Sequence, residues 1–356
     1  AAEYLGYDEH PYDALLDLYE EGLRTRDLVP IFNKLTSDLP PLLRKIMESS
    51  WAPRSHPLEK AQYKTEDLRK ALEEILKALG FPLGLRARLD VSPHPFTTEF
   101  GIKDVRITTR YEGFDFRRAL LGAVHEFGHA LYELQQDERL MYTPIAGGVS
   151  LGVHESQSRF WENIIGRSKE FTTFILPTLK KHLEIIKGYT AEEIFTYFNI
   201  VRPDYVRVEA DEVTYNFHII LRFELEKLMI NENVKASELP ELWNEWMEKL
   251  LGLTPKSYRE GILQDIHWAH GTIGYFPTYT LGTLLSAQIR AKVLTEIPNM
   301  YELVAKGSFT EIKEWLKDKI HRHGSIYPPK ELMVRSLGEW VNPDYFLNYL
   351  REKYLG

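Results

Sequence analysis

The chain has 356 residues, of which 44% are hydrophobic, 27% charged and 12% aromatic, the composition of a folded globular protein. Its net charge is −8 without a basic block, which argues against nucleic acid or an anionic membrane surface as a partner. It contains no cysteine, so any metal must be bound by His, Asp or Glu, and an intracellular, cytoplasmic location is favoured.

Most of the chain shows the apolar spacing of three and four residues that is typical of amphipathic helices. In chain order, this spacing predicts helices over residues 12–26, 65–80, 115–136, 238–252 and 307–321. Two alternating, β-branched stretches, "LRARLDVS" and "DVRITTRY", predict a small β-ribbon near 85–111. The apolar stretch at 281–294 is interrupted by Arg290 and Lys292, short of the roughly 20 apolar residues that a membrane span needs. We therefore expect one mainly helical domain over residues 1–356, with no membrane helix.

The segment "AVHEFGHALYE", residues 123–133, carries the most specific motif of the sequence. On a helix, His125 and His129 lie one turn apart, so both imidazoles leave the same face and can bind one ion. Glu126 is rotated by one residue and can reach water at the metal without ligating, as in the H-E-x-x-H motif. The alternative is a buried core helix with ordinary histidines, because this helix is apolar on nearly all sides.

Two histidines need a third protein ligand if one position is to stay open for water. The segment "GVHESQSRFWENIIG", residues 152–166, supplies Glu155 on a second predicted helix that returns antiparallel beside the first. His154 is adjacent to Glu155 but points about 100° away on a helix, so both cannot ligate easily. We expect His125, His129 and Glu155 to form the metal site, although an isolated glutamate is more often solvated.

Several blocks together resemble the carboxypeptidase Taq family of thermostable metallocarboxypeptidases. They are "HPF" at 94–96, "DVRIT" at 104–108, "HEFGH" at 125–129, "HESQ" at 154–157, "VRVEAD" at 206–211, "GILQDIHW" at 261–268 and "GYFPTYTLG" at 274–282. The resemblance spans nearly the whole chain, but a further N-terminal helical region that is usual in the family is expected to be missing here. The absence of cysteine and the abundance of Glu, Lys and Arg also suit a thermostable protein.

The resemblance implies a mostly helical, groove-bearing fold similar to that of neurolysin and angiotensin-converting enzyme, and a homodimer. It implies removal of single residues from the free C-termini of peptides, with one divalent ion, Zn²⁺ or Co²⁺, as cofactor. Glu126 would then be the general base that takes a proton from water and passes it to the departing amine.

The family blocks also imply donors for the tetrahedral oxyanion. His267 and Tyr279 are the expected residues, and Tyr275 is a competitor of Tyr279. For each of them the alternative is a buried aromatic or histidine side chain that is satisfied by a backbone carbonyl.

An exopeptidase must also recognise a terminal carboxylate, for which a guanidinium is well suited. Arg207 is the preferred residue. Arg106 is the alternative, unless it pairs with Asp104, and Arg202 also remains open. His94 is a candidate for positioning substrate, although a histidine before proline is more often a loop residue.

Two other functions remain open at this point. H-E-x-x-H chemistry does not fix where a peptide is cut, so an endopeptidase or dipeptidase is one alternative. A non-catalytic helical scaffold with a structural metal site is the other. Glu126 argues against the scaffold, because a structural site closes its fourth position and needs no general base.

Overall fold

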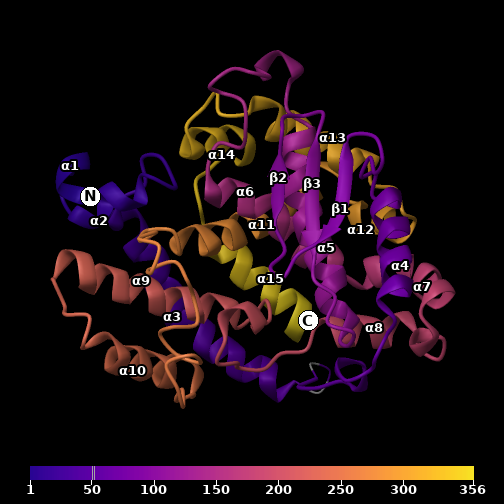
Figure 1. The fold of residues 1–356 in the computed structure, drawn as a ribbon, viewed down its shortest axis with the longest axis horizontal. Helices are drawn as coiled ribbons and strands as arrows, with labels where there is room; N and C mark the ends of the chain where they lie inside the picture. The colour runs from indigo at the N-terminus through magenta and orange to yellow at the C-terminus, as the bar shows by residue number, and fades with distance from the viewer. Residues whose placement is uncertain (50, 52) are drawn as a thin grey trace.

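The fold is built almost wholly from helices, as the apolar spacing predicts (Figure 1). This computed structural model describes residues 1–49, 51 and 53–356. In chain order the helices are α1 Ala2–Leu5, α2 Pro11–Leu16, α3 Thr25–Glu48, α4 Thr65–Ala78, α5 Phe116–Leu134, α6 Leu151–Arg159, α7 Lys169–His182, α8 Ala191–Phe198, α9 Tyr215–Asn231, α10 Leu239–Leu251, α11 Pro277–Glu296, α12 Met300–Ala305, α13 Thr310–Lys319, α14 Pro329–Leu337 and α15 Pro343–Leu355. A π-helix, η3 Phe160–Gly166, continues α6. None of the helices in the described ranges is long and apolar enough to cross a membrane.

Four of the five predicted helices are confirmed, as α4, α5, α10 and α13. The helix predicted over residues 12–26 is wrong, because α2 ends at Leu16 and the chain turns at Gly22, where φ is +80°. The Asp13 carboxylate then accepts hydrogen bonds from the backbone N–H of Thr25, at 2.7 Å, and from its hydroxyl, at 2.6 Å. These bonds satisfy a free donor in the first turn of α3, so a new helix begins where the apolar spacing indicates a continuation.

The predicted β-ribbon is a three-stranded sheet of β1 Ala87–Val91, β2 Thr97–Glu99 and β3 Val105–Thr109, in the order β1-β3-β2. The two predicted stretches do pair, from Ala87 with Val105 onward, but they run parallel. The link between them contains the short strand β2, which pairs antiparallel with the other edge of β3. Helix α5 packs against β2 and β3 (Figure 1), so the sheet lies beside the helix that bears the histidine pair.

Helix α6 is held between α5 and α11 at unusually close range. A Cβ atom added at Gly128 of α5 would lie 2.6 Å from the backbone oxygen of Gln157. One added at Gly282 of α11 would lie 2.5 Å from the Cβ atom of Glu155. Only glycine allows these approaches. The two contacts therefore fix the position of the helix that carries Glu155.

We expect Gly128→Ala to destabilise the protein by about 1–3 kcal/mol or more, since the new methyl group meets backbone that cannot rotate away. The free energy of unfolding in denaturant measures this. Gly188→Ala is the matched control, because a Cβ atom at Gly188 would meet nothing within 4 Å. Equal stability of the two variants would contradict the close packing of α5 on α6.

A buried carboxylate, Glu226 of α9, joins three distant segments. Its Oε2 accepts hydrogen bonds from the Tyr12 hydroxyl at 2.5 Å and from the Gly274 N–H at 3.1 Å. Its Oε1 accepts one from the Trp268 indole N–H at 2.8 Å. Burial raises the pKa of Glu226 from 4.5 to about 7, although these hydrogen bonds lower it in part.

This raised pKa predicts a pH-dependent contribution to stability. Between pH 4.5 and about 7 the folded protein keeps the Glu226 proton that the unfolded chain has released. Stability from this group is therefore lost as the pH rises through that range. Compared with Glu226→Gln, which has no proton to lose, the wild type should lose thermal stability between pH 5 and pH 8. A difference in unfolding temperature that does not change with pH would contradict this.

Candidate active site

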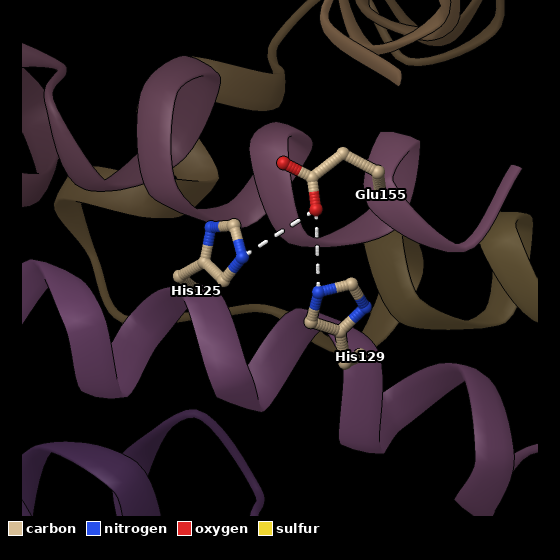
Figure 2. A group of neighbouring side chains, drawn as sticks. All are labelled: His125, His129 and Glu155. Atoms are coloured by element: carbon tan, nitrogen blue, oxygen red, sulfur yellow. Dashed lines mark ion pairs between the residues drawn. The ribbon is translucent and has the colours of Figure 1, made fainter. Parts of the chain in front are cut away.

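Helices α5 and α6 bring the three expected metal ligands together, as Figure 2 shows. The Nε2 atoms of His125 and His129 lie 3.6 and 3.4 Å from Oε2 of Glu155. Ligand atoms about 2.1 Å from a tetrahedral ion would be roughly 3.4 Å apart. The three side chains therefore fit a divalent ion with little rearrangement.

Glu155 is held so that one oxygen remains directed at the histidines. Its Oε1 accepts a hydrogen bond from Nε of Arg159 at 2.7 Å, one turn along α6. Burial opposes ionisation of Glu155, but Arg159 and the two histidines outweigh it and lower the pKa of the carboxyl. An ionised, oriented carboxylate is what a metal ligand requires.

The other imidazole nitrogens face away from this point. Nδ1 of His125 lies 2.8 Å from Oε2 of Glu162, which belongs to the π-helix after α6. Nδ1 of His129 lies 2.7 Å from Nδ1 of His154. His154 is thus behind His129, on the side away from Glu155, in the orientation that the helical rotation predicts.

Glu126 follows His125 on α5 and lies next to the ligand cluster. Its side chain is buried, and its Oε2 accepts a hydrogen bond from the Thr97 hydroxyl of β2 at 2.6 Å. The small sheet therefore orients Glu126 directly.

A cleft of about 320 Å³ opens over His125, Glu126 and Glu155, whereas His129, His267 and Tyr275 are not among its lining residues. Six residues that the sequence singled out line it together with Arg202: His94, His125, Glu126, Glu155, Arg207 and Tyr279. Arg106 is not among them, since it forms an ion pair with Asp104 at 2.6 Å and is part of a separate surface groove. The alternative considered for Arg106, pairing with Asp104, is what the structure contains.

His267 and Tyr275 pack beside Tyr279. The Nε2 atom of His267 is 3.3 Å from the Tyr279 hydroxyl, and the Tyr275 and Tyr279 ring centroids are 5.3 Å apart. Burial, with Arg207 nearby, lowers the pKa of His267 to about 4, so this imidazole is neutral at pH 7. Burial also raises the pKa of Tyr279 well above its ordinary value of 10, so the phenol keeps its proton.

Arg207 is fixed at the edge of the cleft by buried partners. Its Nη2 lies 2.7 Å from Oδ1 of Asp265, which also pairs with Arg222 at 2.5 Å. Its Nη1 donates to the Tyr215 hydroxyl at 2.8 Å, and the guanidinium lies 4.9 Å from the Tyr279 ring centroid. His94 also reaches the cleft, although its Nδ1 is only 2.9 Å from the carbonyl of Pro95.

Sequence reasoning missed the residues that orient the site, namely Thr97, Arg159, Glu162 and Tyr215. A sequence signal existed for two of them. Arg159 lies four residues after Glu155 and Glu162 lies seven residues after Glu155, which places all three on one helical face. Thr97 and Tyr215 gave no comparable signal, because they reach the site only through the tertiary fold.

Comparison with known proteins decides the class of protein. The chain matches the carboxypeptidase Taq (M32) metallopeptidase family over residues 1–354. It belongs to this family. The chain is thus a peptide hydrolase of the metallocarboxypeptidase class, and the expected resemblance is confirmed.

Individual relatives agree with this assignment. Thermostable carboxypeptidase 1 of Pyrococcus furiosus is 66% identical over 355 residues, an alignment that covers 100% of this chain and 71% of the relative. Carboxypeptidase 1 of Bacillus subtilis is 42% identical, with 99% and 70% covered. A solved carboxypeptidase of Pyrococcus furiosus superposes with a TM-score of 0.98 at 66% identity, and an M32 carboxypeptidase of Deinococcus radiodurans with 0.95 at 36% identity. Each superposition covers 99% of this chain and 71% of the other, so the helical fold predicted from the sequence is confirmed.

Proposed function

We propose that this chain removes single residues from the free C-termini of peptides, using one divalent ion held by His125, His129 and Glu155. The observation that carries the proposal is the convergence of these three ligand atoms to within 4.8 Å of one another, beside Glu126. When bound, the ion, for which Zn²⁺ and Co²⁺ are the candidates, supplies Lewis acidity that lowers the pKa of water and polarises a carbonyl.

In this proposal, Glu126 moves the proton. It takes a proton from water as the water oxygen bonds to the scissile carbonyl carbon, and it delivers that proton to the amine nitrogen as the carbon–nitrogen bond breaks. The Thr97 hydroxyl holds Oε2 of Glu126, which leaves Oε1 free for the water.

His267 and Tyr279 would donate to the oxyanion that forms on the carbonyl oxygen. The neutral His267 and the protonated Tyr279 have these donors at pH 7. Tyr275 remains an alternative donor, since its ring contacts both residues. His94, at the mouth of the cleft, would position the peptide chain.

Arg207 would bind the terminal carboxylate of the substrate. Asp265 and Tyr215 engage three of its five N–H groups, on Nε, Nη1 and Nη2. One hydrogen on each terminal nitrogen is therefore left for a carboxylate, the arrangement needed for a two-point contact. Arg106 is a weaker candidate, because it lines a separate surface groove and not the cleft that contains the ligand cluster.

The site of cleavage is tested with an N-blocked dipeptide and its C-amidated twin, followed by analysis of the products. We expect a free amino acid to be released from the free acid only. Cleavage of both peptides would favour the endopeptidase alternative. It would also contradict the role of Arg207 in binding the terminal carboxylate.

We expect Arg207→Lys to lower kcat/KM for the free acid by roughly 10- to 150-fold, the value of about 1.5–3 kcal/mol for a hydrogen bond to a charged group. Lysine keeps the charge but cannot form the two-point contact. Arg106→Lys is the matched control and should leave kcat/KM within twofold of the wild type. If Arg106→Lys has the larger effect, Arg106 is the carboxylate-binding residue.

We also propose that the chain acts as a single catalytic domain, as a homodimer, in the cytoplasm, on peptides and not on nucleic acids or membranes. The cysteine-free composition and the net charge of −8 support the location and the choice of partner. A molar mass in solution close to twice 41.6 kDa would support the dimer, and a value near 41.6 kDa would contradict it.

A further inference from the structure

His154 has no role in the mechanism above, yet it is the middle of a chain of three side chains that ends at a metal ligand, in which Glu133 is buried and the two histidines are partly buried. Its Nδ1 lies 2.7 Å from Nδ1 of His129, and its Nε2 lies 2.8 Å from Oε1 of Glu133. Glu133 is only 5% exposed, so this carboxylate is shielded from water. A buried side chain of this kind needs a structural or functional partner.

The direction of the hydrogen bonds follows from the Glu133 end. The Gly148 N–H donates to Oε1 of Glu133 at 3.0 Å, and the Gln136 amide donates to Oε2 at 2.5 Å. With His154 as the third neighbour, every contact on this carboxylate is a donor, as an ionised carboxylate requires. Nε2 of His154 therefore donates to Glu133.

A neutral imidazole has one N–H and one acceptor nitrogen. In its neutral form, His154 with its proton on Nε2 has its acceptor at Nδ1, so the one proton shared by the two Nδ1 atoms is donated by His129. This leaves the lone pair of His129 on Nε2, the atom that lies 3.4 Å from Oε2 of Glu155 at the metal site. The reverse tautomer of His129 would place a proton where the ion binds.

Close packing keeps the His154 ring in this orientation. A Cβ atom at Gly148 would lie 2.5 Å from Cδ2 of His154 and 3.0 Å from Cε1 of Tyr132. The Tyr132 and His154 ring centroids are 5.0 Å apart. The backbone at Gly148 therefore confines the ring on one side while its N–H fixes Glu133.

The two histidine ligands are thus supported differently. His125 reaches the carboxylate of Glu162 directly, at 2.8 Å. His129 reaches a carboxylate only through the imidazole of His154. We propose that His154, oriented by Glu133, is a positioning residue that holds His129 in the tautomer able to bind the ion, and so raises metal affinity without ligating. This inference rests on the proposed metal site.

The test compares metal binding by His154→Phe, which removes both hydrogen bonds, and by His154→Asn, whose Oδ1 takes the place of the accepting Nδ1. Competition with a chelator should give a 10- to 100-fold weaker affinity for Zn²⁺ in His154→Phe, the usual effect of removing such a partner. His154→Asn should recover at least part of this loss. His182→Phe is the matched control, because His182 forms a similar pair with Glu74 at 2.9 Å on α7, and its removal should leave affinity unchanged.

A spectroscopic measurement separates this role from a merely structural one. In the Co²⁺-substituted wild type, each ligating imidazole should give one exchangeable, paramagnetically shifted Nδ1–H signal in the proton NMR spectrum. His154→Phe should lose or broaden the His129 signal and keep the His125 signal, and the metal-free variant should unfold within a few degrees of the wild type.

Two results would overturn the inference. One is an affinity of His154→Phe for Zn²⁺ within twofold of the wild type, with both N–H signals kept. The other is a His154→Asn variant as weak as His154→Phe. Failure of the proposed metal site itself has a different signature, since the wild type would then not bind the ion stoichiometrically.

Discussion

Glu126→Gln is expected to lower kcat by roughly 10²- to 10⁴-fold, the contribution of a general base to a hydrolytic step. Glutamine has nearly the same shape and still accepts the hydrogen bond that the Thr97 hydroxyl donates to Glu126 at 2.6 Å. It cannot take a proton from water. The loss should therefore fall on kcat, while KM changes little.

The measurement is steady-state hydrolysis of the N-blocked dipeptide, with the metal content of wild type and variant determined on the same samples. Glu126 lies outside the cluster of ligand atoms, so Glu126→Gln should keep its metal. A variant that stays within tenfold of the wild-type kcat would contradict the role of Glu126 as the general base.

Glu155→Gln is expected to weaken metal binding by more than the roughly 10- to 100-fold that is typical of residues behind the ligands, because it removes a charged ligand itself. Activity at limiting metal should fall in parallel. The variant also leaves Arg159 without the Glu155 carboxylate at 2.7 Å, although Glu162 remains 3.3 Å from its Nη1.

Chelator competition measures this affinity, and the unfolding temperature of the metal-free variant shows how much of the change is structural. The exposed Glu331→Gln, which removes an ion pair with Arg335 on α14, is a matched control for loss of one carboxylate charge. Wild-type metal affinity in Glu155→Gln would show that the ion binds elsewhere.

The convergence of His125, His129 and Glu155 could be predicted from the sequence because their geometry is mostly local. Two histidines four residues apart must share a helix face, and an apolar helix such as α5 must be buried. Predicting Glu155 required one assumption about tertiary structure, namely that α6 returns antiparallel beside α5. The glycine at position 128 allows the backbones of these two helices to approach closely.

The strands of the sheet could be predicted from the sequence, but their pairing could not. Residues 87–91 and 105–109 have clear strand patterns, but the direction of pairing depends on β2, whose three residues are too short for a recognisable pattern. The position of Thr97 beside Glu126, and with it the hydrogen bond that orients the proposed general base, could not be read from the sequence for the same reason.

Which arginine lines the cleft could not be predicted from the sequence either, for a different reason. Arg207 is preferred to Arg106 on the sequence, but a guanidinium pairs with whichever carboxylate the fold places nearest. For Arg106 this is Asp104, two residues away on the sheet, whereas Arg207 finds Asp265, which is 58 residues away. Only the tertiary structure places Arg207 in the cleft.

The most direct test of this account is a titration of the metal-stripped protein with Zn²⁺ or Co²⁺ while release of the C-terminal residue from the N-blocked dipeptide is followed. We predict that activity rises linearly and reaches a plateau at one ion per chain, and that Glu155→Gln shows no such rise at equal metal concentration. Hydrolysis by the stripped protein, or one bound ion per chain without hydrolysis, would contradict a catalytic ion at His125, His129 and Glu155.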